Sequence, residues 1–239
     1  WDRFELLLAL DTTGERVRDV IDSFYDVPDV SPARDALEQK MAREGERIDL
    51  YINLASLHLV QDEGDEALPY LEKAKALASN DQQLAEVERL MLMANDPEFE
   101  QRFSEIVAIL DAGNSANAGN VDYLEATVEN APHLLEAHLA LGRAYYAWGD
   151  ADAALEVLLD AQRTLPQAPS VLDWLGRILW EANEQALAFE YLNKGLALFP
   201  NYVPLLVRVG NYLFQNRQLK QARVFLAHAE QIAPRDPSL

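Results

Sequence analysis

Apolar residues recur at intervals of three and four along most of the chain. In one stretch Leu141 and Tyr145 are four residues apart, and after a short polar turn Leu155 and Leu158 are three apart. Such intervals gather the apolar side chains on one side of an α-helix, whereas a half-buried strand would alternate at period two, which no long segment does. The pattern predicts an all-α protein of about 14 helices.

The chain also repeats itself with a period of 34 residues. Each copy has one proline, one glycine and one alanine at this step. They are Pro132, Pro166, Pro200 and Pro234; Gly142, Gly176 and Gly210; and Ala154, Ala188 and Ala222. Between successive prolines lie two amphipathic stretches of about 14 residues each, joined by a polar turn. One copy is therefore a helical hairpin.

The recurrence of glycine, alanine and proline at one step has a physical explanation. Glycine inside a helix costs about 1 kcal/mol relative to alanine, so its return at one phase indicates a compensating close contact, which we expect with the recurring alanine of the next helix. Proline ends the second helix, because it lacks the N–H and clashes with the preceding turn. A single hairpin cannot bury both of its faces, so the copies are expected to stack.

These residues resemble the tetratricopeptide repeat family. The copy at 135–168 carries the family pattern at Leu141-Gly142, Tyr145, Ala154, Ala161 and Pro166. Two further copies follow at 169–202 and 203–236, which makes three consecutive repeats over 135–236, and an earlier copy aligns without gaps at 48–81. The resemblance implies a right-handed superhelical solenoid of stacked antiparallel helix pairs.

The other segments fit the repeat less well. Residues 1–47 are expected to form degenerate helical hairpins. Residues 82–134 are expected to hold an extra helix, which breaks the register, and then a degenerate repeat. The stretch 114–120, rich in Asn, Gly and Ala, is predicted to be a flexible loop.

The resemblance also points to a binding surface. In the family, a second stripe of the first helix of each repeat, rotated by roughly 120° from the packing stripe at 100° per residue, lines a concave groove for a partner's peptide. The positions that match are Leu139, Arg143, Tyr146, Asp173, Arg177, Trp180, Val207, Asn211 and Phe214. Arg suits carboxylates and aromatic residues are common interface anchors, so we expect a partner with acidic and apolar groups. The alternative is that the aromatic residues only pack between repeats.

Charge narrows the choice of partner. The chain has 40 acidic and 20 basic residues, a formal charge of −20, which argues against nucleic acid. The acid is concentrated in residues 1–120, with 26 acidic and 11 basic side chains. The longest apolar run has five residues, so this segment is not expected to insert into a membrane. The excess of Arg over Lys suggests a bacterial source.

Catalytic, metal and cofactor chemistry have little support in the sequence. There is no Cys, which removes thiolate metal sites and Cys nucleophiles. His133 and His138 are roughly 140° apart on a helix at 100° per residue, so they would not share a face for a metal. The glycines at 113 and 119 lack the Lys and Ser/Thr of a phosphate loop. We therefore expect no catalytic residue, no metal site and no cofactor.

Taken together, the sequence predicts a non-catalytic scaffold or adaptor that binds a protein or peptide. Two alternatives stay open. In the first, the segment is expected to be the recognition domain of a larger enzyme, such as a glycosyltransferase or a thioredoxin-like protein, because it begins at Trp1 without Met. In the second, it is expected to be a self-assembling scaffold that forms homo-oligomers. The absence of Cys suits either redox environment, and we take the cytoplasm as the first expectation and the periplasm as the alternative.

Overall fold

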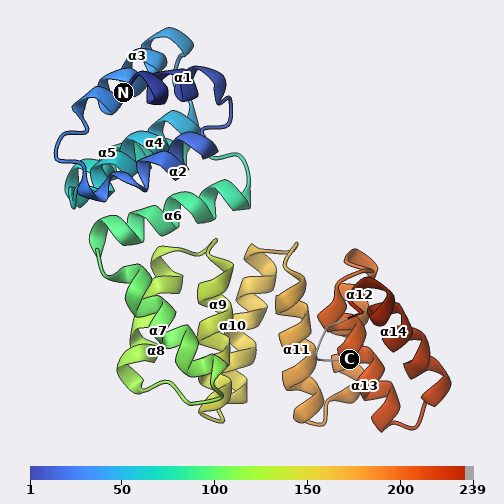
Figure 1. Ribbon diagram of the computed structural model, residues 1–239. Helices are drawn as coiled ribbons and strands as arrows, with labels where there is room; N and C mark the ends of the chain where they lie inside the picture. The colour runs from blue at the N-terminus through green and yellow to red at the C-terminus, as the bar shows by residue number, and fades with distance from the viewer. Residues whose placement is uncertain (235–239) are drawn as a thin grey trace. The chain divides into compact units, whose positions relative to one another are not determined.

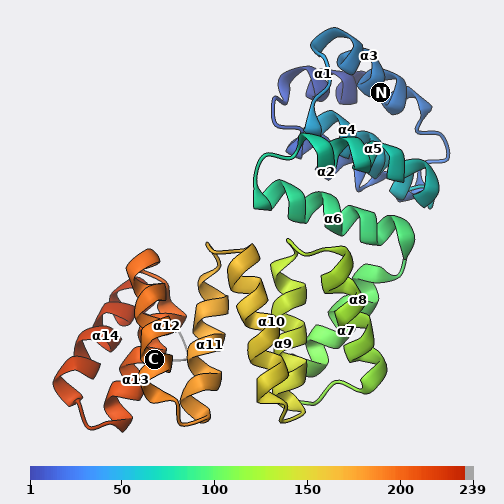
Figure 2. The ribbon, with the colours of Figure 1, turned by 180° about the vertical axis from the view of Figure 1, so that it is seen from behind.

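The computed structural model describes residues 1–234, and every regular element in that range is a helix. These residues form fourteen α-helices and one 3₁₀-helix. Figure 1 labels the α-helices, and Figure 2 shows them from behind. They are α1 (Asp2–Leu10), α2 (Glu15–Ile21), η1 (Phe24–Asp26), α3 (Ser31–Glu44), α4 (Ile48–Leu59), α5 (Gly64–Leu77), α6 (Asp81–Asn95), α7 (Phe99–Asp111), α8 (Ala118–Asn130), α9 (Leu135–Ala147), α10 (Ala151–Thr164), α11 (Pro169–Glu181), α12 (Gln185–Leu198), α13 (Val203–Gln215) and α14 (Leu219–Ile232). The prediction of an all-α chain with about 14 helices is confirmed.

The helices belong to two units. Unit 1 comprises Trp1–Ala108 and Ala126–Leu134, and unit 2 comprises Ile109–Glu125 and everything from Leu135 onward. The division therefore passes through α7 and α8. Each unit has its own buried apolar clusters, such as the one under α1–α4 in unit 1 and the one between α10 and α11 in unit 2.

Unit 2 contains three antiparallel helix pairs in succession, α9–α10, α11–α12 and α13–α14 (Figures 1 and 2). Each second helix also packs against the first helix of the next pair, α10 on α11 and α12 on α13. The first helices touch one another as well, because α11 contacts both α9 and α13. The three pairs lie within the stretch 135–236, for which three repeats are predicted, and positions 235 and 236 lie outside the described residues.

The recurring glycines make room for a leucine of the paired helix. A Cβ atom added to Gly176 would lie 2.4 Å from Cδ2 of Leu192, and one added to Gly142 would lie 3.0 Å from Cγ of Leu158. The third copy repeats this contact with Leu226, 2.7 Å from the same position on Gly210. The expected alanines are buried in the same interface, and in the third copy the carbonyl oxygen of Ala222 also lies 3.5 Å from the added Cβ. The nearest atoms, however, belong to leucine in all three copies, so leucine and not alanine fills the notch that each glycine leaves.

Unit 1 contains the helix pair of the 48–81 copy, α4 and α5, and α6 packs on both. The extra helix fits closely, since a Cβ atom on Gly64 would lie 2.1 Å from the carbonyl oxygen of Ala94 at the end of α6. On the other side, α2 and α3 each pack on α1 and on α4. The central helix α4 is thus enclosed, and all its residues from Asp49 to His58 are buried.

The loop predicted at 114–120 is shorter than expected. Helix α8 begins at Ala118, because Asn117 accepts a hydrogen bond from the N–H of Asn120 through its side-chain oxygen at 2.9 Å and so caps the first turn. The residues before it are tied to the end of α9: the Ser115 hydroxyl donates to the carbonyl of Ala147 at 3.0 Å. The sequence composition indicated a loop but did not show this cap.

Candidate partner-binding site

The predicted site residues lie on the first helices of the three pairs in unit 2. Helices α9, α11 and α13 lie side by side, and the side that carries Arg143, Arg177 and Arg208 is called the arginine face below. Its polar and aromatic side chains contact one another across neighbouring helices. The repeat spacing explains this, since residues about one period apart reach the same height on adjacent helices.

Arg177 lies at the centre of the arginine face. Its guanidinium carbon lies 4.7 Å from the ring centroid of Trp174 and 5.3 Å from that of Tyr146, and the two rings meet edge to face. Its Nε donates to Glu181 at 3.2 Å. Burial, and then the nearby charge of Arg208, lower the pKa of Arg177. Stacking therefore fixes the orientation of this cation, while it keeps 36% of its side chain exposed.

Arg143 is held at one end of the face. Its Nη2 atom donates to Asp111 at 2.6 Å, and its guanidinium carbon lies 5.9 Å from the Trp174 centroid. The Asp111 side chain is 63% exposed, so solvent weakens this ion pair. An incoming carboxylate can therefore compete for Arg143 at small cost.

Asp173 has a different role from the one predicted, since Arg208 occupies both of its carboxylate oxygens. The Nε and Nη2 atoms of Arg208 donate to them at 2.5 and 2.7 Å, and the Asp173 side chain is 8% exposed. Burial alone would lower the pKa of Arg208, but the hydrogen bonds and charge of Asp173 outweigh it and raise the pKa. This fork joins α11 to α13 and leaves Asp173 little free surface for a partner.

The remaining predicted residues divide into buried and exposed ones. Trp180 stacks on Tyr212 with ring centroids 4.0 Å apart, and its Nε1 donates to Gln215 at 3.2 Å. Val207 is buried, and Leu139 is half-buried against the α10–α11 cluster. At the other end Asn211 is exposed, and Phe214 has 61% of its surface in solvent.

Sequence reasoning missed three residues of this face: Trp174, Arg208 and Tyr212. A signal was present for Arg208, because it lies 35 residues after Asp173, the same separation as that of Trp180 and Gln215. Opposite charges separated by 35 residues, which is one repeat period plus one residue, thus indicated an ion pair between the first helices of adjacent repeats. Trp174 gave no comparable signal, since its repeat equivalents are Ala140 and Arg208.

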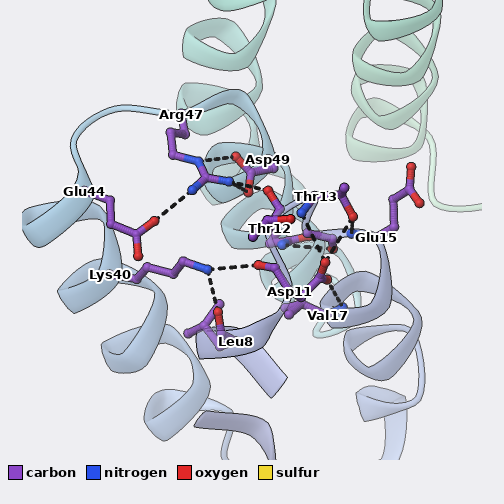
Figure 3. Close-up of polar contacts among 12 residues, drawn as sticks. Leu8, Asp11, Thr12, Thr13, Glu15, Val17, Lys40, Glu44, Arg47 and Asp49 are labelled. Carbon is purple, nitrogen blue, oxygen red and sulfur yellow. Dashed lines mark hydrogen bonds and ion pairs between the residues drawn. The ribbon is translucent and has the colours of Figure 1, made fainter. Parts of the chain in front are cut away.

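A second polar cluster, in unit 1, has a structural role. Figure 3 shows Asp11 at the start of α2, where its carboxylate accepts from the N–H groups of Val17 and Thr13 and from the Thr13 hydroxyl. Burial would raise the pKa of Asp11, but these hydrogen bonds lower it overall. Lys40 donates to the carbonyls of Leu8 and Asp11 at 2.5 and 3.1 Å and so caps the end of α1.

The described residues show no metal-binding cluster: no three His, Asp or Glu side chains among residues 1–234 gather closely enough to hold an ion. The histidine singled out in the sequence has another partner, since Nδ1 of His133 lies 3.0 Å from the buried carboxylate of Glu88. None of the helices in the described part has both the length and the apolar character needed to cross a membrane.

Comparison with known proteins identifies one repeat of unit 2. The family model described as "Tetratricopeptide repeat" matches residues 135–164, which is the helix pair α9–α10 up to its last helical residue. Residues 135–164 match a tetratricopeptide repeat. The family resemblance expected from the sequence is thus supported in this stretch, and the tetratricopeptide fold is generally that of a non-catalytic protein-interaction scaffold.

Several solved structures match this chain. A tetratricopeptide repeat protein from Parabacteroides merdae is 16% identical over 93% of this chain and 94% of its own, with a TM-score of 0.50. A thermophilic TPR protein from Thermus thermophilus is 19% identical over 80% and 93%, with a TM-score of 0.47. The pilF protein of Pseudomonas aeruginosa is 15% identical over 94% and 96%, with a TM-score of 0.47. No curated protein matches in sequence. Identities this low concern the fold alone.

Proposed function

We propose that this tetratricopeptide-repeat chain is a non-catalytic scaffold that binds a partner peptide or protein on the arginine face of unit 2. The partner carries an acidic group for Arg177 and an apolar group for the exposed ring of Phe214. The binding residues are those of the face that stay accessible, chiefly Arg143, Tyr146, Arg177, Asn211 and Phe214.

The observation that carries the proposal is that the guanidinium of Arg177 is held in a fixed orientation. Two aromatic rings hold its guanidinium in place, and Glu181 takes only its Nε. Within residues 1–234 the two terminal nitrogens have no carboxylate partner. A guanidinium offers a planar fork that fits a carboxylate with two parallel hydrogen bonds, and an orientation fixed in advance reduces the entropy lost on binding.

The charge of the chain adds selectivity. Because the whole molecule carries −20, most of its surface repels an acidic partner. Three Arg side chains gather on this one face, and only one of them, Arg208, is neutralised by a buried carboxylate. An acidic segment is therefore steered to the arginine face rather than to the outer helices.

The test is affinity capture from the source cell with the wild type and with Arg177→Glu. We expect the reversal of charge to reduce retention of the partner at least about tenfold, because it removes a charge-assisted contact and adds a repulsive one. Helical circular dichroism and the melting temperature are expected to stay nearly unchanged.

Arg163→Glu is the matched control. Arg163 lies on α10, away from the arginine face, its side chain is 73% exposed, and its substitution changes the net charge by the same amount. Capture of the same partner by the wild type and Arg163→Glu, with loss in Arg177→Glu, supports the proposal. Equal capture by all three variants would overturn it.

A further inference from the structure

Two Asp–Arg pairs of unit 2 each join residues about one repeat period apart. Asp173 and Arg208 are separated by 35 residues, and Asp111 and Arg143 by 32. In each pair the aspartate comes first in the chain, and the arginine belongs to the arginine face. The two pairs are the same kind of contact, so the differences between them are informative.

The two pairs differ in how firmly they are held. Arg208 donates two hydrogen bonds to Asp173, whose side chain is 8% exposed. Arg143 donates one hydrogen bond to Asp111, whose side chain is 63% exposed. Breaking a buried pair leaves a buried charge, whereas an exposed pair contributes little and is screened by salt. Asp111 is therefore the carboxylate that a partner can displace.

The loop after Asp111 keeps this carboxylate within reach of Arg143. Asp111 is the last residue of α7, and the loop that follows is attached to the end of α9. There Nε1 of Trp148 donates to the carbonyl of Ala116 at 2.6 Å. A carboxylate tethered in this way has a high effective concentration, so it returns to Arg143 whenever the site is empty.

Arg143 stays beside Arg177 when Asp111 leaves, because both cations pack on Trp174. Their guanidinium carbons lie 5.9 and 4.7 Å from the centroid of that ring. Burial is the main cause of the lowered pKa of Arg177, and the charges of Arg208 and Arg143 add to it. Within residues 1–234, Nε and Nη1 of Arg143 have no hydrogen-bond partner. Two neighbouring cations with open donors favour a ligand with two negative groups.

We propose that Asp111 is a built-in competitor at the arginine face, and that the partner which displaces it carries two acidic side chains close together. This inference rests on the proposed function. One carboxylate of the partner takes the open nitrogens of Arg177, and the other replaces Asp111 on Arg143. A partner with a single acidic group leaves Asp111 in place and binds more weakly.

The size of the effect follows from the weakness of the resident pair. When a site is open for only a fraction of the time, the affinity for an incoming group is reduced by that fraction. An exposed ion pair is worth little, so Asp111→Asn should raise the affinity by a small factor, about threefold. The melting temperature should change little for the same reason.

The test uses two glutamine-rich hexapeptides, one with two adjacent glutamates and one with a single glutamate. NMR titration of the isotope-labelled protein measures the affinity for each. We expect the wild type to prefer the diglutamate peptide, and Arg143→Gln to remove this preference. Asp111→Asn should bind the diglutamate peptide about threefold more tightly than the wild type, with no gain when Arg143→Gln is also present. Equal affinity of the wild type for both peptides, or no gain in Asp111→Asn, would overturn the proposal.

Asp160→Asn is the matched control for charge. Asp160 lies on α10, where it pairs with Arg163 and is 55% exposed, and its substitution changes the net charge by the same amount. We expect it to leave both affinities unchanged. An equal gain in Asp160→Asn and Asp111→Asn would mean that net charge alone decides, which contradicts a local competitor.

Arg177→Glu separates this inference from the proposed function. Loss of peptide binding in Arg177→Glu, together with the gain in Asp111→Asn, supports both. Loss in Arg177→Glu without a gain in Asp111→Asn means that the arginine face binds acidic peptides but that Asp111 does not compete. Binding that survives Arg177→Glu contradicts the proposed function and this inference with it.

Discussion

At the residue scale, the turns between paired helices keep one backbone conformation although a different residue type occupies the same position in each repeat. Gly149, Asn183 and Arg217 are 34 residues apart, and all three have left-handed backbone, with φ of 83°, 64° and 61°. Each ends a first helix of unit 2, and the next residue donates its N–H back into that helix, as Gln218 does to the carbonyl of Leu213 at 2.8 Å. Glycine adopts this conformation without strain, whereas a residue with a Cβ does not.

We therefore expect Arg217→Gly to stabilise the protein by about 1 kcal/mol, because the exposed arginine side chain is strained at this φ. Chemical denaturation of the wild type and the variant measures the difference in unfolding free energy. Gly149→Ala should lose about the same amount, since no atom lies within 4 Å of the added Cβ and only the backbone strain changes. A destabilised Arg217→Gly would contradict this account.

Sequence reasoning at this scale succeeded where the period alone decides position. It placed Arg143, Arg177, Tyr146 and Phe214 on the first helices of unit 2, where the structure has them. It could not find Trp174, whose contacts with two arginines depend on how α9 and α11 pack. It also predicted that Asp173 contacts the partner, because the sequence does not show that Arg208 of the same chain binds its carboxylate.

At the element scale, the glycine notch sets how closely paired helices approach. The same leucine that fills the notch is fully or almost fully buried at Leu158 and Leu192. The sequence showed that a close contact must exist, because glycine in a helix needs compensation. The choice of leucine over alanine depends on side-chain direction, which the spacing of residues did not reveal.

We expect Gly176→Ala to destabilise the protein by about 1–2 kcal/mol, because the overpacking of Leu192 exceeds the gain in helix propensity. Thermal unfolding followed by circular dichroism measures this change. Gly119→Ala is the control, since its Cβ would meet only the Asn117 side chain at 3.5 Å. There we expect no loss of stability, so equal destabilisation of both variants would show that the notch has no special role.

At the scale of the whole molecule, both units contain helix pairs, but the first helices of these pairs differ in how exposed their side chains are. Unit 2 leaves Arg177 and Phe214 accessible, whereas in unit 1 α4 is buried from Asp49 to His58. The sequence indicated a good repeat at 48–81, but the enclosure of α4 depends on how α2 and α6 pack on it, which the repeat period does not show. That the segment belongs to a larger enzyme, or that it forms homo-oligomers, remains a prediction.

Amide hydrogen exchange with and without the captured partner tests the central claim most directly. The account predicts that the partner slows exchange in α9, α11 and α13, in particular around Arg143, Arg177 and Phe214. The outer helices α10, α12 and α14 should change little. Protection confined to the outer helices, with the arginine face unaffected, would contradict the claim that this protein works through that face.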